Sequence, residues 1–309
     1  MMHMQCSFDK ITKMLEQLNK KTNFYSVLKT KLQAQKAMIA KADYNSIKII
    51  QNNLLSIHES IVGFIKEIED DYNCEAFQDT SGKYGFRSRI SHRIIIPPQW
   101  QYTINFNENL AAVVSANGKY GFIDKKGKLV IPCKWRNAFH FNEGLAMVQN
   151  AIGKYGFINK NGELVIHCKW NNAFMFNEGL SAVVDFKGKY GFIDKKGKLV
   201  IPCKWNNALI FSEGLAAISN SNGKHGYIDK TGSEVIPCTW KGAGTFSEGL
   251  AAVQDFNNKW GYIDNRGKLV ISYQWFWADS FKDGKALVKN DNGEYSYITT
   301  AGSLLSTTQ

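Results

Sequence analysis

A unit of about 35 residues recurs along most of this chain, and the repeat limits the possible folds more than any other feature. Its clearest mark is a tetrapeptide of the type Gly-Lys-Tyr-Gly, found at 82–85, 118–121, 153–156, 188–191, 223–226, 258–261 and, as Gly-Glu-Tyr-Ser, at 293–296. A tryptophan keeps the same spacing, at Trp100, Trp135, Trp170, Trp205, Trp240 and Trp275. We therefore predict about seven tandem units over residues 74–309, each packed against its neighbours.

The residues of one unit predict three short β-strands. Leu145–Val148 and Tyr155–Ile158 are apolar runs separated by a turn, and Leu164–Ile166 follows a second turn that contains Gly162. Strands joined by such short loops form an antiparallel meander. Proline has no N–H to donate to a ladder, so we expect prolines to close the third strand, at Pro97, Pro132, Pro202 and Pro237.

Both faces of these strands are apolar. Tyr120 and Phe122 lie on one face of the second strand, and Gly121 and Ile123 lie on the other. A sheet with one wet face would alternate apolar and polar residues, so we expect each sheet to be stacked between two others. The recurring glycine leaves room for a ring from a neighbour, and the recurring tryptophan is our candidate for that ring.

These residues resemble a known family. The run Gly-Lys-Tyr-Gly-Phe-Ile-Asp-Lys-Lys-Gly-Lys-Leu-Val-Ile-Pro at 118–132, followed by Lys134-Trp135 and by Phe141-Asn142-Glu143-Gly144-Leu145-Ala146, is similar to the WG-repeat (KWG repeat) proteins of bacteria. The resemblance covers roughly 74–305, although only Trp260-Gly261 has the literal Trp-Gly pair. It implies a mainly β repeat array and supplies no catalytic residues.

Two assemblies satisfy the stacking. An open superhelical array would leave its two ends apart, whereas a closed ring would make a seven-bladed propeller. A unit of 35 residues is short for the usual four-stranded blade, which favours the open array.

Residues 1–73 lie outside the repeats and predict an α-helical hairpin, with arms near 8–41 and 45–71. The second arm has a coiled-coil-like apolar stripe with steps of three and four residues: Ile47, Ile50, Leu54, Ile57, Ile61, Phe64 and Ile68. The stripe could pack on the rest of the chain as a cap. Alternatively, it could dock a partner or mediate homo-oligomerisation, and the sequence leaves both open.

Composition and motif absence indicate in which cellular compartment the protein works. The six cysteines form no CxxC pair, no apolar run approaches a membrane span, and the first residues do not resemble a secretory signal. We therefore expect a cytoplasmic protein with no membrane partner. A formal net charge of +11 favours anionic partners without naming one.

We expect no metal site, no cofactor and no catalytic residues. The cysteines at 133, 168, 203 and 238 are one unit apart, too far for one zinc ion to hold them together. A glutamate before Gly-Leu in most units, such as Glu143, more simply satisfies local backbone donors than catalyses a reaction. The aspartates that open the lysine-rich turns, such as Asp124, are expected to bond the turn backbone.

Two sets of residues are candidates for binding. Basic side chains gather at the hairpin turns and form a candidate anion-binding set: Lys125, Lys126, Lys128, Lys195, Lys196, Lys198, Arg266 and Lys268. Positions near each tryptophan differ between units and form a candidate partner-binding set: Arg136, Asn137, His140, Asn171, Asn172, Met175, Asn206, Asn207, Lys241, Phe276 and Trp277.

Three hypotheses for function follow. The first is a non-catalytic scaffold or adaptor whose array binds a protein and whose hairpin docks or oligomerises. The second is a nucleic-acid-binding protein that uses the lysine ribbons. The third, least favoured, is an enzyme with a pocket in the array.

Overall fold

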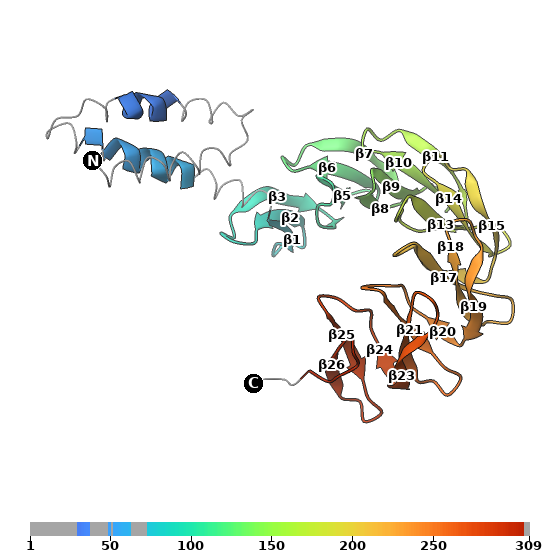
Figure 1. The fold of residues 1–309 in the computed structure, drawn as a ribbon. Helices are drawn as coiled ribbons and strands as arrows, with labels where there is room; N and C mark the ends of the chain where they lie inside the picture. Colours follow the sequence, from blue (N-terminus) through green and yellow to red (C-terminus); the bar gives the residue numbers. More distant parts are fainter. Residues whose placement is uncertain (1–29, 38–48, 51, 63–72, 306–309) are drawn as a thin grey trace. The chain divides into compact units, whose positions relative to one another are not determined.

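The computed structural model describes residues 30–37, 49–50, 52–62 and 73–305 (Figure 1). Contacts divide the chain into two compact units: residues 1–77 with 85–97, and residues 78–84 with 98–309. The first unit contains helical residues at 30–37, 49–50 and 52–62. The rest of the predicted helical arms lies outside the described residues.

The apolar stripe of the second helical segment is buried where it is described. Ile50, Leu54, Ile57 and Ile61 are buried, while Ile47, Phe64 and Ile68 lie outside the described residues. The Asn53 side-chain amide donates a hydrogen bond of 3.2 Å to the Gln35 side chain, which links the two helical segments. The four described side chains are therefore covered by other residues of the chain, and the role of the stripe as a cap or a docking element stays a prediction. No helix in the described part of the chain is long and apolar enough to cross a membrane.

The described part of the repeat region forms 26 strands in seven separate antiparallel sheets. The first sheet has β1 (Cys74–Gln78), β2 (Tyr84–Ser88) and β3 (Ile94–Trp100). The second has β4 (Tyr102–Thr103), β5 (Leu110–Val114), β6 (Tyr120–Asp124) and β7 (Leu129–Trp135). The third has β8 (Asn137–Asn142), β9 (Leu145–Gln149), β10 (Tyr155–Asn159) and β11 (Leu164–Trp170).

The remaining sheets follow the same order of strands. The fourth has β12 (Asn172–Ala173), β13 (Leu180–Val184), β14 (Tyr190–Asp194) and β15 (Leu199–Trp205). The fifth has β16 (Asn207–Ala208), β17 (Leu215–Ser219), β18 (His225–Asp229) and β19 (Glu234–Trp240). The sixth has β20 (Gly242–Ala243), β21 (Leu250–Gln254), β22 (Trp260–Asp264) and β23 (Leu269–Trp275), and the seventh has β24 (Trp277–Ala278), β25 (Lys285–Lys289) and β26 (Tyr295–Thr299).

The predicted antiparallel meander is confirmed, and a short fourth strand adds to it in the five central sheets. In the fourth sheet this is β12, where Asn172 pairs with Val184 and Ala173 with Val183. Two residues carry too little periodicity to predict a strand from sequence alone.

The prediction that proline closes the third strand is wrong. Strand β15 continues through Pro202 to Trp205 and is the outermost strand of its sheet. Proline is tolerated there because an edge strand has a side on which no ladder bond is needed. The pairing also shifts, since Phe192 faces Ile201 but Tyr190 faces Trp205. The extra residues between these pairs form a bulge.

The recurring strand glycine makes room for this bulge and not, as predicted, for a tryptophan ring. A Cβ atom on Gly191 would lie 2.6 Å from the Ile201 carbonyl oxygen and 2.8 Å from the Cys203 Sγ and backbone N. Gly121, Gly156, Gly226 and Gly261 are crowded in the same way by their own outer strand. The glycine and the bulge therefore require one another.

The core lies between sheets. Five clusters of buried side chains each join one sheet to the next along the chain, as both the open array and the ring require. Between the fourth and fifth sheets, Phe192 and Phe211 meet edge to face with centroids 4.8 Å apart. Trp205 is buried in the same cluster, which confirms a structural role for the recurring aromatic residues.

A methyl group at the crowded glycine tests this packing. We expect Gly191→Ala to lower the free energy of unfolding by about 1–3 kcal/mol, because the bulged backbone must move. A urea titration followed by circular dichroism measures the change. Gly244→Ala is the matched control, since its Cβ would lie 3.5 Å from the nearest atom and needs no movement. Equal midpoints for the two variants would contradict the account.

Candidate functional site

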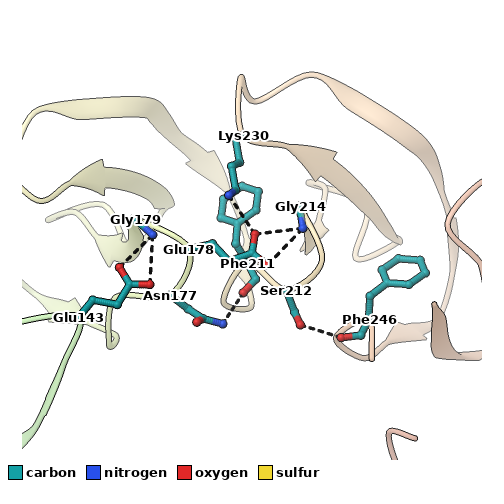
Figure 2. Close-up of polar contacts among 9 residues, drawn as sticks. All are labelled: Glu143, Asn177, Glu178, Gly179, Phe211, Ser212, Gly214, Lys230 and Phe246. Carbon is teal, nitrogen blue, oxygen red and sulfur yellow. Dashed lines mark hydrogen bonds and ion pairs between the residues drawn. The ribbon is translucent and has the colours of Figure 1, made fainter. Parts of the chain in front are cut away.

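A glutamate in the loop before the first long strand joins each central sheet to the next. The Glu178 carboxylate accepts hydrogen bonds from the Gly214 backbone N–H, at 3.0 and 3.3 Å, and forms an ion pair of 3.0 Å with Lys230 (Figure 2). Gly214 and Lys230 both belong to the fifth sheet, whereas Glu178 belongs to the fourth. We call this arrangement the glutamate clamp.

The clamp recurs with the repeat. Glu108 bonds Gly144 and Lys160, and Glu143 bonds Gly179 and Lys195 in the same way. The prediction that these glutamates satisfy local donors is therefore wrong in one respect, because the donor lies 36 residues away on the next sheet. Glu213 and Glu248 keep the bonds to the following glycine, at Gly249 and Gly284.

A second polar contact runs beside the clamp. The Asn177 side-chain amide donates to the Phe211 carbonyl oxygen, and the Ser212 hydroxyl donates to the Phe246 carbonyl oxygen, both at 2.7 Å (Figure 2). These bonds also span consecutive sheets. Two recurring polar positions of the repeat are thus used to hold consecutive sheets together.

The clamp lowers the pKa of two of its carboxylates, Glu178 and Glu108. Partial burial raises the pKa of Glu178. The Lys230 ammonium and the Gly214 N–H together lower this pKa by more than burial raises it, so it lies below its usual value. Glu108 is shifted in the same direction for the same reasons. A carboxylate with a lowered pKa suits an ion pair better than general acid catalysis near neutral pH.

The turn aspartates behave as predicted. The Asp194 carboxylate accepts hydrogen bonds of 2.9 Å from the backbone N–H groups of Lys196 and Lys198. Asp124, Asp229 and Asp264 make equivalent bonds in their own turns.

The predicted anion-binding set lies at these turns. Lys195 is engaged by Glu143 in the clamp, and Lys125 is half-buried. The other six side chains are exposed: Lys126, Lys128, Lys196, Lys198, Arg266 and Lys268. Exposed cations therefore occur in the second, fourth and sixth sheets.

The predicted partner-binding set is split by the structure. Its exposed members are Arg136, Asn171, Asn206, Asn207, Lys241, Phe276 and Trp277, and its half-buried members are Asn137, His140, Asn172 and Met175. The Asn171 and Asn206 amide oxygens accept hydrogen bonds from Lys154 and Lys189 of the preceding hairpin. Lys241 likewise donates to Asn258. These residues remain a predicted surface, with several of its polar groups already bonded within the chain.

The cysteines fill the space beside the strand glycines. Burial raises the pKa of the Cys203 and Cys238 thiols to about 11, and a nearby carboxylate adds to each shift, so these thiols stay protonated at neutral pH. Within the described ranges, no three His, Cys, Asp or Glu side chains converge as a metal site would require. The half-buried Trp240 donates its indole N–H to the Tyr273 hydroxyl at 2.8 Å.

Sequence reasoning missed two groups of exposed apolar residues. The first is a pair at the start of four outer strands, such as Leu199 and Val200 in β15. The second comprises Tyr295 and Tyr297 in β26. The signal for the second group was present, because the last unit replaces the strand glycine with Ser296 and the Gly-Leu pair with Gly284-Lys285.

Comparison with known proteins identifies the repeats. The family model described as "WG containing repeat" matches six times, at residues 88–120, 120–151, 155–190, 190–224, 226–260 and 260–295. No protein with a curated function matches the sequence.

Several solved structures match this chain at low identity and with TM-scores below 0.5. The computationally designed protein Ika8 is 12% identical with a TM-score of 0.48, over 74% of this chain and 80% of that one. BamB from Moraxella catarrhalis is 9% identical with a TM-score of 0.43, over 74% and 82%. The WD40 β-propeller domain of Doa1 is 10% identical with a TM-score of 0.37, over 74% and 89%.

Removing one charge tests the clamp. We expect Glu178→Gln to destabilise the protein by about 0.5–1 kcal/mol, since it loses the partly exposed ion pair but keeps an acceptor for Gly214. The loss should shrink in high salt. Because the folded-state pKa of Glu178 is lowered, its contribution is present above the unfolded pKa and disappears as the pH falls through the folded pKa.

The matched control is Glu213→Gln, because Glu213 bonds Gly249 but has Asn265 where the clamps of Glu108, Glu143 and Glu178 have lysine. Urea unfolding midpoints at neutral and acidic pH give both values. An equal, salt-independent effect of the two substitutions would show that the lysine contributes nothing.

Proposed function

This chain belongs to the family of WG-containing repeat proteins, and from that premise we propose that it is a non-catalytic scaffold that recognises a protein partner through its repeat array. We further propose that it works in the bacterial cytoplasm as an adaptor. Cys133, Cys168, Cys203 and Cys238 form no disulfide within the described residues, which suits a reducing compartment.

One observation carries the proposal. The residues that recur in most units are engaged within the array: the clamp glutamates, the turn aspartates and the buried aromatic rings. The residues that differ between units include exposed ones such as Arg136, Asn207 and Phe276. A constant frame with a variable exterior is what repeat proteins use to recognise macromolecules.

A second candidate is nucleic-acid binding. It is favoured by the exposed cations at the turns of alternate sheets, such as Lys126 and Lys196. Binding that depends on phosphate contacts weakens steeply with salt, so a linear fall of log affinity with log salt concentration would favour this candidate over a protein partner.

The experiment compares partner recovery by surface variants of the full chain. We expect the tagged protein to recover a stoichiometric protein partner from nuclease-treated lysate, and Arg136→Ala with Asn207→Ala to reduce its yield at least about fivefold. Lys126→Ala with Lys196→Ala is the control for the turns. Quantitative mass spectrometry after crosslinking gives the yields. Recovery of no stoichiometric protein partner, or loss of the partner only in the turn variant, would contradict the proposal.

A further inference from the structure

Each central sheet buries a defined apolar face against the following sheet. In the fourth sheet, Leu180, Ala182 and Phe192 are buried against Ala208, Phe211 and Ala216 of the fifth sheet. We call the side of a sheet that packs on the following sheet its trailing face. Val184 and Tyr190, which pair with one another, complete this face at one end of the strands.

The trailing face of the seventh sheet is exposed. Three units later in the chain, Lys285, Leu287 and Tyr297 occupy the positions of Leu180, Ala182 and Phe192. The other side of this sheet, with Ala278, Val288 and Ile298, is buried against the sixth sheet. The trailing face carries four exposed aromatic residues at its surface and margin, which are Phe276 (57%), Trp277 (38%), Tyr295 (60%) and Tyr297 (43%).

Lysines and aromatic rings form a continuous row across this face. Trp277 pairs with Lys289, and Lys289 pairs with Tyr295, so the three side chains cross the three strands in line. The Lys289 ammonium lies 5.1 Å from the Tyr295 centroid and 5.8 Å from that of Phe276. Lys285 lies 5.1 Å from the Tyr297 centroid.

A role as a simple cap does not account for these residues. An exposed outer face needs polar side chains to stay soluble, and the two lysines provide some of them. The Asn-Asn pair found at 171–172 and 206–207, however, becomes Phe276-Trp277 in the last unit. This change adds exposed apolar surface where a cap would remove it.

We propose that the trailing face of the seventh sheet docks a β-segment of an acidic partner protein. This inference rests on the proposed scaffold function and specifies the chemistry of the partner. The segment would take the place of an eighth sheet, about 10 Å away, as the fifth sheet does on the fourth. The face is therefore continuous with the interface that the array already uses between its own sheets.

The face specifies a pattern in that segment. Lys285 and Lys289 are four residues apart on one strand, which places them about 13 Å apart, with Leu287 between them. An extended segment with carboxylates at positions i and i+4 would match Lys285 and Lys289, and an apolar residue at i+2 would match Leu287. Its aliphatic parts would bury the rings while its carboxylates meet the lysines.

Two other occupants are disfavoured. A second copy packed face to face would bring four lysines together, which is unfavourable. Nucleic acid would have to stack its bases on the rings of Tyr295 and Tyr297, but Lys289 and Lys285 already lie over these rings.

Charge reversal with defined probes tests the inference. The probes are two fluorescent synthetic peptides, one containing Glu-Thr-Ile-Thr-Glu and the other Lys-Thr-Ile-Thr-Lys, and a fluorescent oligothymidylate. Binding is measured by anisotropy at low salt, with the full chain. We expect the acidic peptide to bind about tenfold or more tightly than the basic one, and Lys285→Glu with Lys289→Glu to reverse that preference.

Lys187→Glu is the matched control, because Lys187 also lies over an exposed ring, that of Phe186, but on a hairpin of the fourth sheet. It should leave the preference unchanged. Thermal melting monitors the fold of each variant, and Tyr295→Ser, which keeps both lysines, should weaken the acidic peptide severalfold without reversing the preference.

Four results would overturn the inference: no binding of either peptide, equal binding of both, an unchanged preference after charge reversal, or tighter binding of the oligothymidylate. A concentration-dependent dimer that is lost on Lys285→Glu with Lys289→Glu would assign the face to a second copy instead. If the peptides fail while the array still recovers a protein partner, the docking face is wrong and the scaffold function stands.

Discussion

The burial of each sheet by the next is the interaction on which the rest of this structure depends. A sheet of three or four short strands with two apolar faces is not stable alone in water. Each of the five clusters lies between consecutive sheets, so each hydrophobic core is formed by residues of two sheets. Residues that bring sheets into contact must then recur in every unit, and the exposed positions are left to differ.

The glutamate clamp shows how strongly this contact is specified. Glu178 has a φ of 52°, a left-handed conformation that costs a non-glycine residue about 1 kcal/mol or more. Glu108, Glu143, Glu213 and Glu248 share that conformation. The strained backbone directs the carboxylate to the glycine N–H of the next sheet, and the contact between sheets compensates for the strain.

The repeat period and the turn chemistry were sufficient to predict the meander, the stacking and the turn aspartates. They were insufficient for contacts that join residues on different sheets. Nothing local to Glu178 indicates that its donor is Gly214, and the bulge at Pro202–Lys204 depends on pairing with a glycine on another strand. Of the candidate site, the exposed Phe276 and Trp277 were predicted from their departure from the repeat. Tyr295 and Tyr297 were missed because both stand at ordinary repeat positions, and the signal lies only in the neighbouring Ser296 and Lys285.

Hydrogen exchange in a Phe211→Ala variant tests most directly whether neighbouring sheets stabilise one another. Phe211 belongs to the fifth sheet but is buried against Phe192 of the fourth. Truncating a buried ring of this kind costs about 3–5 kcal/mol. Mutual burial predicts that amides of β13, β14, β17 and β18 all lose protection, with smaller losses farther along the array. Loss of protection confined to the fifth sheet would show that each sheet is stable by itself and would contradict the account.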